Sequence, residues 1–380
     1  MLDYHSRQLI VILSLTLLGL SVTVEAQHSS EVVLDLRTLT VEYTPALRAD
    51  DPSHQILLSD PSEPEAGHVR VAQIETDASI RMAGVEIAVE EPDAVVTGSS
   101  AMSELRLARY DLWLTGSSNG WRLDVADSQG GPGTAPLNIV GTVPLTHTSV
   151  TANSPTFIAG LVPTGTDQAR LLLRWGRHEW TTEVQFLIPR ESRPRQRDPL
   201  GDQRTFEFDS AEIQRSNRLT RRNTATVRLG NGPRLMVVYG RNMQVEDRDF
   251  AHLVSVATGM VVTTTASAVI RLDIDVPLQF GEVTLNTGNV GGLKDSPGGY
   301  GVWLRRAADG WRLVFNDEPD AWGTQHDPSF DAGEVSLDYS QVDDSSRALS
   351  ASVVMTTPDQ GRFVLIWGPH EWSATFTVLS

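Results

Sequence analysis

The tryptophans of this chain occur in pairs with a nearly constant spacing, and this repeat constrains the fold more than any other feature. Eight of the nine Trp form four pairs that lie 190 or 192 positions apart, Trp113/Trp303, Trp121/Trp311, Trp175/Trp367 and Trp180/Trp372. Chance does not space a rare residue type in this way. Because a period near 190 is too long for a solenoid repeat, we predict two copies of one domain.

Short motifs accompany the paired tryptophans. Gly120–Leu123 reads Gly-Trp-Arg-Leu, as does Gly310–Leu313, and Trp175–Trp180 shares the pattern Trp-Gly-x-His-Glu-Trp with Trp367–Trp372. The earlier parts match more weakly, and there the alignment pairs Val41–Tyr43 with Val237–Tyr239 and Ile80–Arg81 with Ile270–Arg271.

Alternation of apolar and polar residues with a period of two predicts β-strands throughout both copies. Arg170–Trp175 and Arg362–Trp367 are examples, and Asn119-Gly120 and Asp309-Gly310 are typical of tight hairpin turns. We therefore predict an all-β fold of two tandem antiparallel β-sandwich domains, jelly-roll-like and of common origin, with the paired tryptophans in their cores.

The expected domains follow from composition. Residues 1–26 form a signal peptide, 27–189 the degenerate N-terminal copy, 190–222 a polar, Arg-rich linker and 223–380 the C-terminal copy.

The first 26 residues predict export. Arg7 precedes the apolar run Leu9–Val24, and small residues at Val24 and Ala26 suggest cleavage after Ala26. We expect a periplasmic or extracellular protein with no membrane span once this segment is removed; an uncleaved anchor is the alternative. The chain has no Cys, so its stability owes nothing to disulfides.

The net charge of −17 argues against nucleic acid as a partner, because phosphate binding needs a positive field. No cofactor-binding motif is present, and the single His of each His-Glu-Trp motif does not make the two-histidine zinc pattern. We predict no cofactor and no metal site, although the acidic segment from Asp317 to Asp331 leaves calcium open as an alternative.

A family resemblance rests on the second copy. Gly310–Asn316 is followed by Ala321–Pro328, which reads Ala-Trp-Gly-Thr-Gln-His-Asp-Pro, and Val237–Arg241 opens the domain. This region resembles the bacterial domain-of-unknown-function family 2911, clearly over residues 223–380 and faintly over 31–189. His326 stands where the family usually has Tyr. The resemblance implies an exported β-sandwich module and no known activity.

Comparison of the copies locates a candidate site. At an offset of 190, Asn316 becomes Ala126 and His326 becomes Pro136, so the first copy lacks the polar groups of the second. A Trp beside amide, hydroxyl, imidazole and carboxylate groups is suited to a small polar ligand or glycan. The candidate ligand-binding residues are Asn316, Trp322, Thr324, His326 and Asp327, with Tyr239 and Arg241 as neighbours. The alternative is a loop whose side chains cap its own backbone.

No pattern identifies catalytic residues: there is no Cys and no Gly-x-Ser-x-Gly elbow. Our leading hypothesis is an exported, non-enzymatic ligand-binding or structural protein. One alternative is an extracytoplasmic hydrolase or metal-dependent enzyme that acts on carbohydrate or peptide through the C-terminal domain. Another is an envelope scaffold.

Overall fold

The computed structural model describes residues 27–58, 67–89, 107–117, 120–128, 136, 138–187, 222–241, 243–289 and 297–379. Within these ranges the fold is all-β, as predicted, with two short α-helices and one 3-10 helix. The predicted signal peptide and all of the predicted linker except Arg222 lie outside the described residues. None of the helices described is long and apolar enough to span a bilayer.

The N-terminal half, residues 27–187, carries helix α1 (Pro52–Leu58) and antiparallel strands. These strands are β1 (His28–Leu34), β2 (Arg37–Tyr43), β3 (His68–Thr76), β4 (Ile80–Met82), β5 (Val85–Ile87), β6 (Ala108–Ser117), β7 (Gly120–Asp127), β8 (Ile139–Pro163) and β9 (Gln168–Phe186).

The C-terminal half, residues 222–379, carries helix α3 (Arg248–Ser255) and the 3-10 helix η2 (Pro328–Phe330). Its strands are β10 (Arg222–Arg228), β11 (Arg234–Gly240), β12 (Ile270–Ile274), β13 (Leu278–Phe280), β14 (Val283–Leu285), β15 (Gly298–Ala307), β16 (Gly310–Asn316), β17 (Asp331–Gln341), β18 (Ser350–Met355), β19 (Gln360–Trp367) and β20 (His370–Val378).

The two halves have the same strand pairing. The order β1–β2–β3–β6–β7–β8 in the first half recurs as β10–β11–β12–β15–β16–β17 in the second. The register is also shared, because Trp113 lies opposite Asp124 as Trp303 lies opposite Val314. Even the irregularity before Asn316 has a counterpart before Ala126. The tryptophan spacing therefore marks equivalent strands.

One part of the sequence alignment is wrong. Ile80 lies in β4 opposite Phe186, and the residue in the equivalent position is Leu278 of β13, opposite Val378. Ile270 instead lies in β12 opposite Val302. The spacing between equivalent residues falls from 198 at β4 to 190 at β6, because the first half has eight more residues between its fifth and sixth strands.

Strand β9 turns back on itself at Gly176, whose φ of 61° lies in the left-handed region that favours glycine. The turn brings Arg170 Nε within 2.8 Å of a Glu183 carboxylate oxygen. In the C-terminal half the same path is made by separate strands, β19 and β20, which meet at a turn containing Gly368 (φ 57°).

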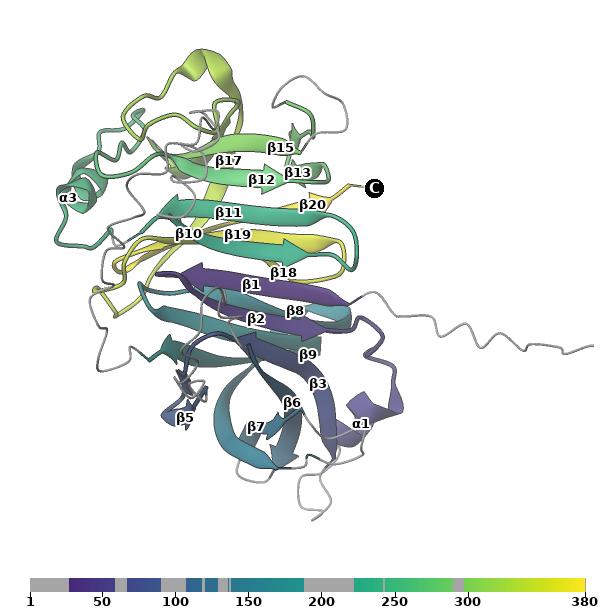
Figure 1. Cartoon of the computed structure of the whole chain (residues 1–380). Coiled ribbons are helices and arrows are strands. Elements are labelled where there is room, and N and C mark those ends of the chain that lie inside the picture. The colour runs from purple at the N-terminus through teal and green to yellow at the C-terminus, as the bar shows by residue number, and fades with distance from the viewer. Residues whose placement is uncertain are drawn as a thin grey trace, which may run out of the picture.

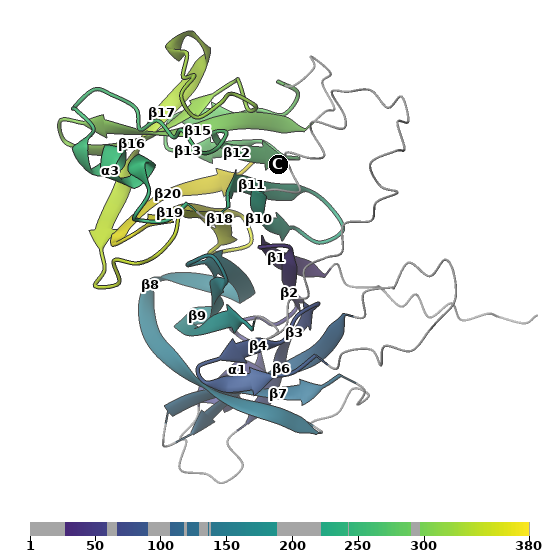
Figure 2. The ribbon, with the colours of Figure 1, turned by 60° about the vertical axis from the view of Figure 1, so that its left-hand side comes forward.

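The halves join through β1 and β10, which pair antiparallel, so that one sheet runs from one half into the other (Figure 1). These strands are equivalent, and their pairing relates the halves by a local twofold axis at which Glu31 lies opposite Thr226. In the second layer, Val162 of β8 and its counterpart Val354 of β18 belong to one small apolar cluster at the junction, and Figure 2 shows these strands facing each other.

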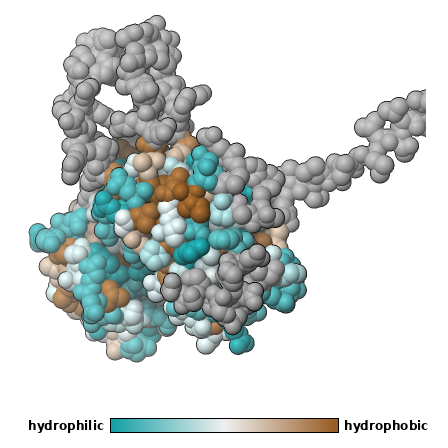
Figure 3. All heavy atoms as spheres, turned by 90° about the horizontal axis from the view of Figure 1, so that it is seen from below, coloured by the Kyte–Doolittle hydropathy of each residue, from teal (hydrophilic) through white to brown (hydrophobic). Residues whose placement is uncertain are grey.

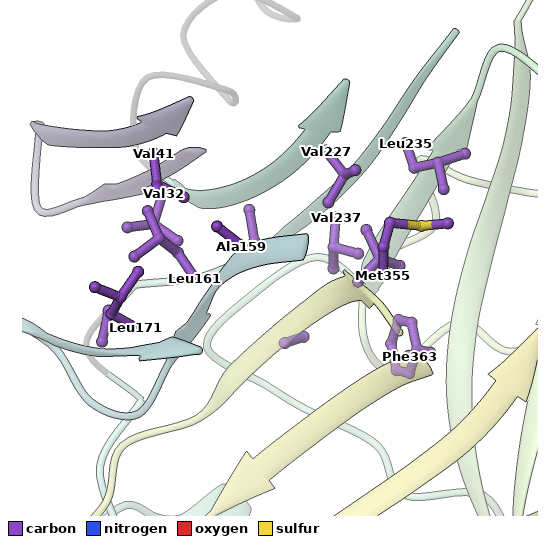
Figure 4. Packing of buried hydrophobic residues seen from close by; sticks show 14 of the residues in the cluster. Val32, Val41, Ala159, Leu161, Leu171, Val227, Leu235, Val237, Met355 and Phe363 are labelled. Atoms are coloured by element: carbon purple, nitrogen blue, oxygen red, sulfur yellow. The ribbon is translucent and has the colours of Figure 1, made fainter. Parts of the chain in front are cut away.

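The main core is also continuous across the junction. Figure 4 shows Val32 and Leu161 of the first half on one side and Val227 and Val237 of the second half on the other, with Ala159 between them, and all five belong to one buried cluster. Sheet and core therefore pass from one half to the other. The division into separate domains, 27–189 and 223–380, stays a prediction.

The paired tryptophans are core residues, as predicted, with Trp121 only partly buried. Seven of the eight are buried, with Trp175, Trp180 and Trp372 entirely so. The unpaired Trp322 is 45% exposed and belongs to no core cluster.

The surface at the β6–β7 end of the N-terminal half mixes hydrophilic and hydrophobic residues (Figure 3).

Candidate functional site

The candidate residues from 316 to 327 lie at one end of the C-terminal half, where β16 and β17 are joined by a loop. We call Asp317–Phe330 the 317–330 loop. Asn316, at its base, is 1% exposed. The Asn316 amide nitrogen donates to the backbone oxygen of Asp327 and to Oδ1 of Asp331, both at 2.9 Å, and its oxygen accepts from the N–H of Glu318 at 2.9 Å. Asn316 therefore fixes both ends of the loop.

Asp327 fixes the last turn of the loop. Its Oδ1 accepts from the backbone N–H of Ser329 at 2.9 Å and from the Ser329 hydroxyl at 2.7 Å, which caps η2. These hydrogen bonds from Ser329 lower the pKa of the Asp327 carboxyl, which is therefore held as an ionised acceptor. The exposed carboxylate thus acts first on its own backbone.

His326 is held by a carboxylate and an indole. Its Nε2 donates to Asp331 Oδ1 at 2.9 Å, and its ring centre lies 5.0 Å from that of Trp303. The other oxygen of Asp331 accepts from Arg305, which also bonds Glu334 at 2.6 Å. The imidazole is therefore one member of an ion-paired chain that joins the loop to strands β15 and β17.

The loop rests on its own small core, on the sheet face opposite the main core. Trp303, Val269 and Val314 form this cluster, and Ala321 of the loop packs on it. Gly323 lies so close to Thr264 and Ser267 that a Cβ would come within 2.7 Å of the Ser267 backbone oxygen. The loop and the segment before β12 are therefore tightly packed.

Trp322, Thr324 and Asp327 are the exposed residues of the predicted set, and of these only Asp327 uses its side chain to fix the loop. The backbone of Trp322 forms a bridge with Ala268, so its position is fixed while its indole faces solvent. Among the described residues, neither the Trp322 nor the Thr324 side chain takes part in the loop's own hydrogen bonding.

Tyr239 and Arg241 lie outside this network of contacts. Tyr239 is fully buried in the main core, where burial raises the pKa of its hydroxyl. Arg241 lies 2.9 Å from Asp35, at the tip of the β1–β2 hairpin, and so ties the two halves together. The structure therefore brings together the five loop residues of the candidate set and places these two in structural positions.

Two of the hollows that are lined by described residues are considered as ligand sites. A cavity of about 50 Å³ lies under the loop segments, lined mainly by apolar side chains such as Met243, Trp303 and Trp367, and it is far smaller than the about 300 Å³ at which ligand pockets begin. A hollow of about 660 Å³ in the first half is lined by residues including Ile87 and Val140. Its lining includes Val89, Leu107 and Ser128, each of which is next in the chain to a residue outside the described ranges.

The sequence comparison missed a polar cluster in the N-terminal half. Asp124 is almost completely buried and accepts from Thr142 at 2.8 Å and from Thr115 at 3.2 Å. Asp111, also buried, lies 2.8 Å from Arg70. The sequence contained a signal for this cluster, because polar residues occupy alternate positions of β6 and β7 beside Trp113. Comparison at a fixed offset did not detect it, since that comparison considered only polar groups present in the second copy.

In the described part of the chain, no group of three or more His, Cys, Asp or Glu side chains is arranged to hold a metal ion. This includes the acidic segment from Asp317 to Asp331.

Comparison with known proteins relates the C-terminal half to a family model. Residues 222–376 match the model of a family described as "Protein of unknown function (DUF2911)". The chain matches no curated protein and no solved structure.

Proposed function

We propose, from the premise that residues 222–376 form a domain of the family of unknown function DUF2911, that this protein is an exported, non-enzymatic binding protein. Its contact surface is the 317–330 loop, and its ligand is a glycan or another small polar molecule with an apolar face. The observation that carries the proposal is the exposure of Trp322 on a loop whose backbone is fixed on both sides.

An exposed indole on a fixed backbone is suited to binding. A Trp side chain offers a large flat apolar face, which stacks well on the C–H face of a sugar ring. Because Asn316 and Asp327 already order the loop, ligand binding would cost little conformational entropy. Thr324 and Gln325, which are both exposed and follow Trp322 closely in the chain, supply hydroxyl and amide groups that can orient a polar ligand.

The same contacts support a non-enzymatic role. Asn316 uses both its amide nitrogen and its amide oxygen in hydrogen bonds within the loop. His326 is bound to Asp331, and Asp327 caps η2. A hydrolase would need such groups directed at a substrate. Here they are directed at one another, which favours the loop-stabilising role over a catalytic one.

Binding can be tested by thermal shift and calorimetry with a panel of soluble oligosaccharides. We expect at least one member to stabilise the wild-type protein and Trp322→Ala to abolish that shift, because the stacking face is lost. Met260→Ala removes another exposed apolar side chain from the same half and should leave binding unchanged. If no oligosaccharide stabilises the wild type, or Trp322→Ala binds as well as it does, the glycan proposal fails.

The export part of the proposal depends on residues 1–26. Expression of the full-length chain in a bacterial host, followed by intact-mass analysis of the periplasmic fraction, should find a protein that begins at Gln27. A full-length protein confined to the cytoplasm would contradict it.

A further inference from the structure

Three imidazoles gather in the N-terminal half where α1 lies against the turn of β9. We call His54, His147 and His178 the histidine cluster. Nε2 of His147 lies 3.0 Å from Nδ1 of His178, and the two rings are stacked with centres 5.2 Å apart. The ring of His54, on α1, lies 6.0 Å from that of His178 and 4.7 Å from that of Trp175.

The hydrogen bonds restrict which nitrogens carry protons. Nδ1 of His54 lies 2.9 Å from the backbone oxygen of Ala49, so this nitrogen must donate. In the neutral ring Nε2 then has a lone pair, and it is buried without a hydrogen-bond partner. Between His147 and His178 one nitrogen must donate and the other must accept, so the pair can hold this contact only while one of the two facing nitrogens is unprotonated.

The C-terminal half repeats this arrangement with fewer ionisable groups. The counterparts of His54, His147 and His178 are, in chain order, Phe250, Tyr339 and His370 by strand register and ring contacts. Tyr339 lies 2.8 Å from His370 in place of the His–His contact, and the Phe250 ring lies 6.0 Å from His370. The same scaffold therefore carries three imidazoles in one half and one in the other.

We propose that the histidine cluster is a pH-sensitive latch that holds α1 on the N-terminal half while its imidazoles are neutral and releases it on acidification.

Helix α1 depends on this contact. It has only seven residues, too few to be stable on its own, and its buried side chains include His54 and Leu57. A second proton on the His147–His178 pair would set two N–H groups against each other. A proton on Nε2 of His54 would be a buried N–H with no acceptor. The change at His54 acts on α1 directly, and the change at the His147–His178 pair acts through His178, whose ring contacts that of His54.

No described carboxylate faces the cluster to compensate an added charge. The rings that contact it are the indoles of Trp121, Trp175 and Trp180. On β9, Glu179 alternates with His178 and so points to the opposite face, near Arg174, and Arg177 lies in the turn itself. On the α1 side, Arg48 and Asp50 form an exposed ion pair, and the Asp51 carboxylate accepts a hydrogen bond from the backbone N–H of Ser53.

The pKa shifts of the cluster set the sign of its pH dependence. Burial lowers the pKa of His147, and burial together with the neighbouring imidazoles lowers that of His178. The folded state therefore binds fewer protons than the unfolded chain below the ordinary histidine pKa of about 6.5. Stabilisation by the cluster is complete above that pH and is lost as the pH falls below it.

Hydrogen exchange of the whole protein tests the latch. Protection factors for residues 44–58, corrected for intrinsic exchange rates, are compared at about pH 7.5 and about pH 5.5. We expect wild-type protection to fall about tenfold at the lower pH, which lies about one unit below the ordinary histidine pKa. In the variant His54→Phe/His147→Tyr, which installs the residues of the C-terminal half, only His178 of the cluster remains, so protection should depend on pH much less than in the wild type. Unchanged wild-type protection would overturn the proposal.

The reverse exchange guards against a variant that fails to fold. Phe250→His/Tyr339→His places three imidazoles in the C-terminal half, and protection of residues 248–255 should then become sensitive to acid as that of 44–58 is. If α3 in this variant keeps the same protection at both pH values, the latch is contradicted.

Discussion

At the scale of single residues, burial separates the tryptophans into two classes. Seven of the eight that recur in both halves are buried, with edge-to-face contacts such as that between Trp311 and Trp372, whose ring centres lie 5.5 Å apart. The unpaired Trp322 is exposed and makes no ring contact that the structure records. In the proposed function this indole is the face that contacts the ligand, whereas the buried indoles serve packing.

The two classes should differ sharply in stability measurements. Trp372→Ala leaves a cavity between the sheets and should lower the free energy of unfolding by about 3–5 kcal/mol. Trp322→Ala should change it by less than about 0.5 kcal/mol. Urea unfolding followed by circular dichroism measures both, and equal losses in the two variants would contradict the assignment.

Asn316 shows the same distinction for a polar side chain. Asn316→Ala leaves the backbone N–H of Glu318, in a buried part of the loop, without its hydrogen-bond acceptor. We therefore expect the free energy of unfolding to fall by about 1–3 kcal/mol. The exposed Thr324→Ala is the control and should be neutral. Since Ala126 occupies the equivalent position in the first half, the strand itself accepts Ala, and a global failure to fold would contradict a role confined to the loop.

At the scale of elements, the 317–330 loop is held to the segment before β12 by close backbone approach. Hydrogen bonds from the backbone N–H of Thr264 to the oxygen of Gly323 (2.8 Å) and from that of Gly323 to the oxygen of Ser267 (3.1 Å) join the two. The loop is therefore a packed element with a fixed conformation, and its exposed side chains are presented in one geometry.

Gly323→Ala should disturb this element locally. The added Cβ would meet the hydroxyl and backbone oxygen of Thr264, so the loop must shift at a cost of about 1–3 kcal/mol. We expect reduced hydrogen-exchange protection in 262–269 and 317–330, with β18–β20 unchanged. Gly310 lies in an open turn at a φ of 145°, so Gly310→Ala strains the backbone without touching the loop and serves as the control.

Local pattern predicted the strands and the buried tryptophans, because alternation and aromatic content are properties of each strand itself. It did not predict the equivalence of β4 and β13, because insertions in connecting segments shift the offset without a local signal. The candidate loop residues were expected to lie together because they are contiguous. Their orientation, with Asn316 inward and Trp322 outward, depends on packing against residues far away in sequence, such as Trp303 and Ala268.

At the scale of the whole molecule, two copies of one pairing scheme share a sheet and a core. Equivalent strands meet at the junction, as in a dimer with twofold symmetry, but the partners belong to one chain. Arg241 and Asp35 add an ion pair between the halves. A perturbation of β1 or β10 is therefore expected to destabilise both halves, because their edge strands are completed only by each other.

Cysteine crosslinking across β1 and β10 tests this arrangement most directly, since the natural chain has no Cys to interfere. Val33 lies opposite Thr224, whereas Arg228 lies four residues further along β10, about 13 Å away. We expect Val33→Cys/Thr224→Cys to form an intramolecular disulfide on mild oxidation and Val33→Cys/Arg228→Cys to form none, as read by peptide mass spectrometry of the monomer. A disulfide in the second variant alone, or in neither, would contradict a sheet that runs continuously through two equivalent halves.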